Sequence, residues 1–192
     1  MTLSERLIIG FCGAKGSGKD TGYKLLTELY PNLSFKRIAF ADPIKNTICD
    51  IFGLTVDQLN TIKRIDSIGI IDYAYDKTYG QLTGRDLVRK IGMLMRNYDD
   101  QQFNRYVQDT IRNDKHSNYV ITDVRFENEI AAVKTIGGYI IRVDRDSCKY
   151  DNHVTERKID NPDFIIDNNK DLQHYKDQLK DIIDQIIKEQ TC

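Results

Sequence analysis

A glycine-rich segment near the N-terminus has the residue types and spacing to hold a phosphate group. Residues 13–19 read Gly-Ala-Lys-Gly-Ser-Gly-Lys, which is the pattern G-x-x-x-x-G-K. An apolar run that predicts a buried strand, residues 6–12, precedes it, and a run that predicts a helix, residues 20–30, follows it. Glycines let backbone N–H groups turn towards an anion, and the helix start adds positive dipole character. The pattern predicts a phosphate-binding loop, with a plain strand-to-helix turn as the alternative.

The predicted ATP contacts extend from this phosphate loop, residues 13–19, into the first turn of the following helix. Lys19 is placed to neutralise charge on a phosphate during transfer. Asp20 stands where such loops usually carry Ser or Thr as a magnesium ligand, so its carboxylate is expected to bind Mg²⁺ directly or through water. The alternative for Asp20 is an anion that stabilises the helix N-terminus. The predicted ATP-binding residues, to which Arg145 is added below, are Gly13, Ala14, Lys15, Gly16, Ser17, Gly18, Lys19, Asp20 and Thr21.

A second acidic residue ends another apolar run, residues 118–123. Asp123 occupies the place where enzymes with a phosphate loop keep a carboxylate linked to magnesium, and Arg125 would clamp a phosphate. The alternative is a structural Asp–Arg pair at a strand end, and Glu129 is expected to be a cap or a surface charge. The predicted catalytic residues are Lys19, Asp20, Asp123 and Arg125, with Asp20 and Asp123 as the metal ligands.

Three arginines share one face of a predicted helix over residues 83–98. Arg85, Arg89 and Arg96 are spaced i, i+4 and i+11, and eleven residues make about three helical turns. Arginine binds phosphate through two parallel hydrogen bonds, so these residues are candidates for acceptor binding. A solvated basic stripe is the alternative. The apolar residues expected to point inward on this helix include Leu94 and Met95.

Further polar residues stand at two other loops. Asp42 and Lys45 begin a helix that ends near Gly53, where Asp42 is expected to be the N-cap or a substrate contact and Lys45 a phosphate or solvent contact. Arg145 begins a polar segment, residues 145–160, that would form a lid, and its side chain would stack on adenine. A lid that closes over the phosphates would exclude water from the site.

Composition excludes several classes of function. The 192 residues carry a net charge of −1, without a basic face or interleaved aromatic and basic residues. This balance gives no general attraction to a nucleic acid polymer or an anionic membrane. No apolar run approaches the roughly 18 residues of a transmembrane helix, and four scattered cysteines show no zinc-ligand spacing. A cytoplasmic protein is expected, in the host cytoplasm if the chain is viral.

Strands and helices alternate along the chain, which predicts an α/β fold with a parallel five-stranded sheet flanked by helices. The expected strands cover residues 6–12, 35–41, 118–123, 139–144 and 163–167. Ligands of such sheets bind beyond the carboxyl ends of the strands, and functional residues are expected after Cys12, Ala41, Thr122 and Val143. Residues 1–192 are expected to form a single domain. It would have a core over about 5–62 and 115–192, an acceptor-side helical insertion over about 63–114, and the lid.

The tetrapeptide Gly-Lys-Asp-Thr, residues 18–21, resembles the phage-type deoxynucleoside monophosphate kinase family. Residues 40–45, 84–92 with Arg96, 120–129 and 153–156 are similar to further segments of that family, in the same order. The resemblance implies the P-loop fold of nucleoside monophosphate kinases. It also implies transfer of the γ-phosphate of ATP, with Mg²⁺, to a deoxynucleoside monophosphate. It adds His153 and Glu156 to the substrate-binding set and favours acceptor or lid roles for Arg85 and Arg96.

Two departures from the family pattern bear on the substrate. Phe103 occupies the place of a tryptophan often found there, and residues 63–82 match poorly. The preferred base and sugar are therefore left open, as is the oligomeric state, with a homodimer through the terminal helix as one option. Alternatives in function are another small-molecule kinase, such as a phosphomevalonate kinase, which shares the Gly-Lys-Asp loop, and an ATP-binding switch protein. The arginine-bearing helix and the lid-like segment favour a kinase over a switch.

Overall fold

A computed structural model of the chain describes residues 6–62, 84–150 and 158–191. Its centre is a five-stranded sheet with strand order β2-β3-β1-β4-β5, and every neighbouring pair is parallel. This confirms the α/β fold and the parallel sheet predicted from the alternation of apolar runs. The strands are β1 (Ile8–Cys12), β2 (Phe35–Ile38), β3 (Asn118–Ile121), β4 (Tyr139–Asp144) and β5 (Phe164–Asp167).

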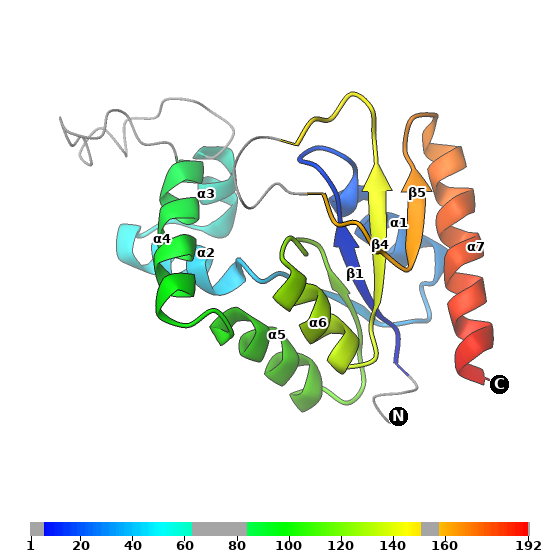
Figure 1. The fold of residues 1–192 in the computed structure, drawn as a ribbon, viewed down its shortest axis with the longest axis horizontal. Coiled ribbons are helices and arrows are strands. Elements are labelled where there is room, and N and C mark those ends of the chain that lie inside the picture. The colour runs from blue at the N-terminus through cyan, green and yellow to red at the C-terminus, as the bar shows by residue number, and fades with distance from the viewer. Residues whose placement is uncertain (1–5, 63–83, 151–157, 192) are drawn as a thin grey trace. The chain divides into compact units, whose positions relative to one another are not determined.

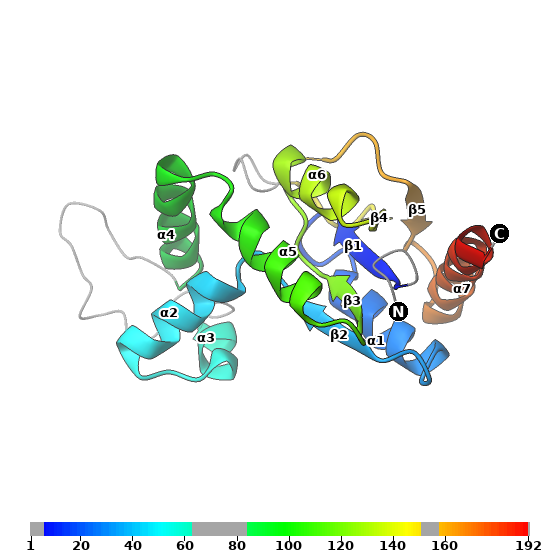
Figure 2. The same ribbon diagram turned by 90° about the horizontal axis from the view of Figure 1, so that it is seen from below.

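The helices of this sheet unit cover both faces of the sheet (Figures 1 and 2). On one face, α1 (Lys19–Leu29) and α7 (Leu172–Thr191) contribute Leu25, Leu26, Tyr175 and Leu179 to a core with Phe11. On the other face lies α6 (Glu127–Thr135), and Val133 approaches Gly10 of the central strand. All residues of β1 and β3 are buried, as expected for central strands of a parallel sheet.

The contact pattern divides the chain into two compact units, residues 1–40 with 104–192 and residues 41–103. The second unit contains α2 (Asp42–Phe52), α3 (Val56–Ile62) and α4 (Gly84–Tyr98), while α5 (Gln102–Asn113) begins at its end. Within it, α2 packs against both α3 and α4. The sequence-based insertion began at residue 63, but this packing places α2 and α3 in the same unit as α4.

Two local predictions for the helical unit were wrong. Asp42 is the first residue of α2 rather than its N-cap, because the N-cap is Ala41, and the Asp42 carboxylate bonds to Lys45 instead. Leu94 and Met95 were expected to point inward, yet they are 69% and 40% exposed. Helix α4 approaches α2 through Gly92, and Leu94 lies about 200° further round the helix because each residue turns it by about 100°. The apolar stripe is therefore narrower than the sequence suggested.

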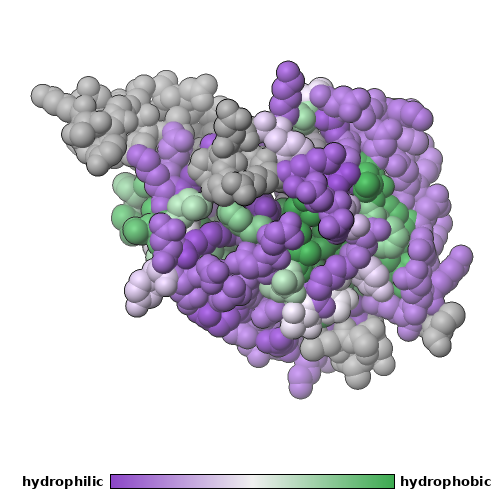
Figure 3. Space-filling model, viewed as in Figure 1, coloured by the Kyte–Doolittle hydropathy of each residue, from purple (hydrophilic) through white to green (hydrophobic). Residues whose placement is uncertain are grey.

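The surface of the described part is largely polar. Hydrophilic side chains cover most of the face shown in Figure 3, and the apolar areas between them are small. In the ranges that the structure describes, no helix combines the length and apolar character needed to cross a membrane.

Candidate active site

The phosphate loop connects β1 to α1 at the carboxyl edge of the sheet, the upper edge in Figure 1. Three of its residues have backbone angles that favour glycine, with φ of 135° at Gly13, 81° at Gly16 and 113° at Gly18. Close neighbours add a second constraint at two of them. A Cβ at Gly13 would collide with the carbonyl oxygen of Val143, and one at Gly18 would lie 2.6 Å from Nδ2 of Asn168. The glycines of the sequence motif therefore permit a loop conformation that side chains at Gly13 and Gly18 would prevent.

Lys19 lies against the backbone of this loop. Its Nζ donates hydrogen bonds to the carbonyl oxygens of Gly13 at 2.8 Å and Ala14 at 2.7 Å. These bonds hold the positive charge of the half-buried lysine beside the loop. A fixed ammonium group in this place is suited to a phosphate, because it needs little reorganisation when negative charge arrives.

Two polar features of the loop suit an anion. The N-cap of α1 is Gly18, which has no side chain to accept a hydrogen bond. The N–H groups of the first turn are therefore not capped by a side chain at this position. The hydroxyl of Ser17 is fully buried, and no hydrogen-bond partner for it exists among the described residues. Buried hydroxyls normally have a partner, so an orphan in a loop of this kind indicates a ligand or a water molecule.

The remaining predicted loop residues differ in exposure. Ala14 is buried, Thr21 is half-buried, and Lys15, Gly16 and Asp20 are exposed. The Asp20 carboxylate thus stands in the first turn of α1 with access to solvent. This position is compatible with a metal ligand and with a charge that stabilises the helix start.

Cys12, which directly precedes the loop, is buried and chemically quiet. Burial raises the pKa of its thiol from 9.0 to about 12, and the nearby Arg142 and Lys19 only partly oppose this effect. The thiol therefore stays protonated near neutral pH and is no candidate nucleophile.

Asp123 lies just beyond β3, which pairs with β1 in the sheet. The parallel pairing sets Gly10 opposite Ile121, and the N–H of Val124 donates to the carbonyl of Phe11 at 3.2 Å, so Asp123 lies beside the end of β1. One oxygen of its carboxylate, Oδ1, accepts a hydrogen bond from the N–H of Phe40 at 2.8 Å. The side chain is therefore held between the ends of β2 and β1, at the edge of the sheet where ligands of this fold bind.

The turn after Asp123 is held by a buried carboxylate. Oε2 of Glu129, which is 1% exposed, accepts hydrogen bonds from the N–H groups of Arg125 at 2.8 Å and Phe126 at 3.2 Å. Glu129 is thus a cap of α6, one of the two roles expected for it. This cap fixes the backbone of Arg125, whose side chain is half-buried.

The segment predicted to form the lid is only partly described. Arg145 is exposed at the end of β4, in a turn where the N–H of Cys148 donates to its carbonyl at 2.9 Å. His153 and Glu156 lie outside the described residues. Arg142, which is 7% exposed, binds both carboxylate oxygens of Asp144 and donates to the carbonyl of Ile159 at 2.7 Å. This arginine therefore connects β4 to the chain on the far side of the segment.

The helical unit contains the other predicted binding residues. Nζ of Lys45 lies 3.0 Å from the Asp42 carboxylate, and both side chains are largely buried. The guanidinium group of Arg96 stacks over the Phe103 ring, 4.6 Å from its centre, which orients the arginine by a cation–π contact. Arg89 is half-buried on the same helix, whereas for Arg85 the structure describes only the backbone, at the start of α4.

Two residues that contact the phosphate loop were not predicted from the sequence. Asn168, directly after β5, donates from Nδ2 to the carbonyl of Ser17 at 2.6 Å, and the hydroxyl of Tyr175 donates to the carbonyl of Gly18 at 3.1 Å. The loop after β5 was left out of the expected functional loops. The rule that ligands bind beyond strand ends would have pointed to Asn168, while no local pattern distinguishes Tyr175 from a core tyrosine.

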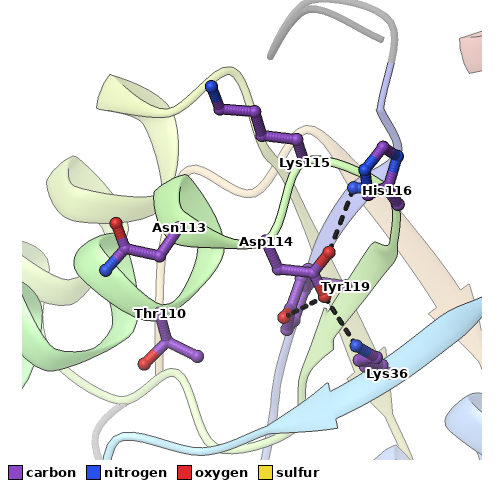
Figure 4. Close-up of a pocket in the computed structure, with 7 residues that line it drawn as sticks. All are labelled: Lys36, Thr110, Asn113, Asp114, Lys115, His116 and Tyr119. Atoms are coloured by element: carbon purple, nitrogen blue, oxygen red, sulfur yellow. Dashed lines mark hydrogen bonds and ion pairs between the residues drawn. The ribbon is translucent and has the colours of Figure 1, made fainter.

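A shallow pocket of about 580 Å³ lies at the opposite edge of the sheet, near the starts of β2 and β3 (Figure 4). Its central residue is Asp114, whose carboxylate accepts hydrogen bonds from Lys36 at 2.7 Å, Tyr119 at 2.9 Å and the N–H of His116 at 3.0 Å. The contact with Lys36 holds the pKa of Asp114 well below its usual range. These contacts make the pocket wall a structural junction between α5 and the sheet, remote from the phosphate loop.

Two comparisons of the sequence with known proteins indicate the same family. The profile of the deoxynucleotide monophosphate kinase family matches residues 78–179. A protein of Acanthamoeba polyphaga mimivirus, provisionally named a deoxynucleotide monophosphate kinase, is 30% identical over 194 residues, covering 93% of this chain and 96% of that protein.

Two solved structures are similar to the chain at low identity. The Mycobacterium tuberculosis APS kinase in complex with AMPPNP and APS is 12% identical, with a TM-score of 0.49, and the match covers 96% of this chain and 98% of that one. The shikimate kinase of Aquifex aeolicus is 15% identical, with a TM-score of 0.48 and coverage of 95% and 98%. From the family profile and the mimivirus relative, the chain belongs to the deoxynucleotide monophosphate kinase family and is a nucleotide kinase.

Proposed function

We propose that the protein transfers the γ-phosphate of ATP to a deoxynucleoside monophosphate, giving ADP and a deoxynucleoside diphosphate. The observation that carries this proposal is the phosphate loop, in which three glycines with positive φ and the bonded Lys19 surround a helix start. Family membership supports a nucleotide acceptor. The ATP-binding set is then Gly13 to Thr21, with Arg145 proposed to contact the adenine.

The reaction needs a nucleophile, a leaving group and compensation of charge. An oxygen of the acceptor's phosphate attacks the γ-phosphorus, and the bond from that phosphorus to the β–γ bridging oxygen breaks, so that its electron pair leaves with ADP. Lys19 stabilises the charge that develops on the transferring group, and Arg125 is proposed to contact the same phosphate. Catalysis of this kind depends mainly on position and electrostatics, which a held lysine and a capped turn both provide.

Magnesium fits the oxygen donors of this site. Among the described residues no cluster of three or more His, Cys, Asp or Glu could hold a metal ion by itself. Mg²⁺ in kinases is usually held by substrate phosphates, water and one or two carboxylates, which Asp20 and Asp123 would supply. When bound, the ion would neutralise charge on the β- and γ-phosphate oxygens.

The acceptor is proposed to bind through the helical unit. Arg85, Arg89 and Arg96 offer guanidinium groups for its phosphate, and Arg96 is already oriented by Phe103. Asp42 and Lys45, which pair with each other, and the lid residues His153 and Glu156 complete the proposed set. A lid over residues 145–160 would limit the loss of phosphate to water.

An assay of ADP release with a panel of acceptors tests the function. We expect release to accelerate with at least one deoxynucleoside monophosphate and to require Mg²⁺. Ribonucleoside monophosphates in the same panel define the sugar preference, and phosphomevalonate tests the related small-molecule kinase. ATP binding without acceleration by any acceptor would contradict the proposal and favour an ATP-binding switch protein.

A further inference from the structure

Two side chains from the C-terminal half of the fold hold consecutive carbonyl groups of the phosphate loop. Asn168 follows β5, and its own N–H donates to the carbonyl of Asp144 at 2.8 Å, which anchors it at the carboxyl edge of the sheet. From there its Nδ2 reaches the Ser17 carbonyl at 2.6 Å. Tyr175, on α7, is 0% exposed, and its hydroxyl reaches the Gly18 carbonyl at 3.1 Å.

Holding a carbonyl group also sets the direction of the next N–H group. A trans peptide unit is planar, and its C=O and N–H bonds point in opposite directions. The described chain contains no cis peptide bond. Asn168 therefore orients the N–H of Gly18 by holding the Ser17 oxygen. Tyr175 orients the N–H of Lys19 by holding the Gly18 oxygen, together with the N–H of Gly22, which donates to the same oxygen at 2.9 Å. In the same way, the two bonds from Lys19 orient the N–H groups of Ala14 and Lys15.

The two glycines nearest these side chains leave room for them. A Cβ at Gly18 would lie 2.6 Å from Nδ2 of Asn168, and one at Gly22 would lie 2.6 Å from the Tyr175 hydroxyl. Burial raises the pKa of the Tyr175 phenol well above its usual range, so the hydroxyl stays protonated and remains a donor. Glycine peptides are the most flexible in the chain, and external bonds are an effective means of restricting them.

We propose that Asn168 and Tyr175 are positioning residues, which hold the N–H groups of Gly18 and Lys19 in the orientation that binds the phosphates of the nucleotide donor. The proposal rests on the ATP site proposed above. Neither residue needs to touch the donor, because each acts through a peptide unit of the loop. The benefit is preorganisation: a loop held before binding loses less conformational entropy when the nucleotide arrives.

The structure supplies a matched control for Tyr175. Tyr30 stands at the other end of α1, and its hydroxyl also bonds to α7, at Asp184 Oδ1 (2.7 Å) and the Lys180 carbonyl (3.2 Å). Tyr175→Phe and Tyr30→Phe each remove one phenolic hydroxyl group that bonds across the α1–α7 contact. Only the Tyr175 hydroxyl contacts the phosphate loop. A purely structural role predicts that both variants lower the melting temperature and leave nucleotide affinity unchanged.

The test compares the Kd of a non-hydrolysable ATP analogue, and the KM values of ATP and of the acceptor, in the two variants and the unaltered protein. We expect Tyr175→Phe to raise the Kd of the analogue and the KM of ATP about 3- to 10-fold, which is the effect of losing one hydrogen bond. Tyr30→Phe should bind the analogue as the unaltered protein does, and the acceptor KM should stay constant in both.

Asn168 gives a second, independent comparison. Asn168→Ala should raise the Kd of the analogue by a similar factor. Asn169 lies in the same turn but bonds to Asp146 and Asp167, so Asn169→Ala should leave this Kd unchanged. If the unaltered protein binds the analogue and the folded variants Tyr175→Phe and Asn168→Ala bind it equally well, the positioning role is wrong, while the proposed ATP site stands. If the unaltered protein fails to bind the analogue, the proposed ATP site fails, and the positioning role fails with it.

Discussion

In the proposed reaction, Lys19 supplies the positive charge that stabilises the transferring phosphate. It lies against two carbonyl oxygens of the phosphate loop, so that its charge is held in place before any substrate binds. Lys19→Ala should therefore remove about 3–4 kcal/mol of transition-state stabilisation, which lowers kcat on the order of a hundred- to a thousandfold. The variant should remain folded, as circular dichroism would show. Lys24→Ala, an exposed lysine one turn further along α1, is the control and should keep full activity. Comparable activity in both variants would exclude the assigned role of Lys19.

A substitution at Asp20 tests whether its carboxylate is a metal ligand or a charge that stabilises the helix. If its exposed carboxylate helps to hold Mg²⁺, Asp20→Asn should shift the magnesium titration of turnover to higher concentration and lower kcat. If the carboxylate only favours the N-terminus of α1, the same change should cost about 0.3–1 kcal/mol of stability and little activity. We expect the first result. An unchanged magnesium titration with near-normal turnover would remove Asp20 from the catalytic set.

At the scale of elements, α4 is expected to serve the acceptor and not ATP. Arg96 is oriented by Phe103 within the helical unit, whereas the phosphate loop belongs to the sheet unit. Arg96→Ala should raise the KM of the monophosphate or lower kcat, with little change in the affinity for ATP. The exposed Arg112 of α5 gives a matched control, since Arg112→Ala removes the same charge elsewhere. A loss of ATP binding without an effect on the acceptor would reverse the assignment.

The limits of sequence reasoning follow the range of the interactions involved. The strands, the phosphate loop and the capped turn at Glu129 were predictable because their signals are local: apolar runs, glycine spacing and a carboxylate four residues after Arg125. Leu94 was misplaced because the width of the buried stripe on α4 depends on where α2 packs. Tyr175 was missed because its partner lies 157 residues away, and nothing near it in the sequence signals the phosphate loop.

At the scale of the whole molecule, buried acids of high pKa make the fold sensitive to alkali. Burial raises the pKa of Cys12 from 9.0 to about 12 and, together with a hydrogen bond to Asp114, that of Tyr119 from 10.0 to about 12. The pKa values of these two groups are higher in the folded protein than in the unfolded chain. The stabilisation that the two groups contribute to the fold is therefore complete at a pH below their unfolded pKa values. It is lost as the pH rises from about 9 towards 12.

The expected result is a free energy of unfolding that falls above pH 9, with Cys12 contributing a slope of about 1.4 kcal/mol per pH unit. Urea titrations at several pH values would measure it. Cys12→Ala removes this contribution, so its curve should be flatter between pH 9 and 10, whatever its stability at neutral pH. Parallel curves for the two proteins would show that the thiol does not cause the loss.

The bonds from Asn168 and Tyr175 also bear on how the enzyme is made. The phosphate loop leaves the ribosome early, but the side chains that hold its Ser17 and Gly18 carbonyls follow 151 and 157 residues later. Domains fold as synthesis proceeds from the N-terminus, at about 5–20 residues per second. A nascent chain that stops before residue 168 can contain the whole glycine motif and still lack both of these bonds. Assembly of the complete loop, with both of these bonds, thus coincides with the arrival of α7 at a late stage of translation.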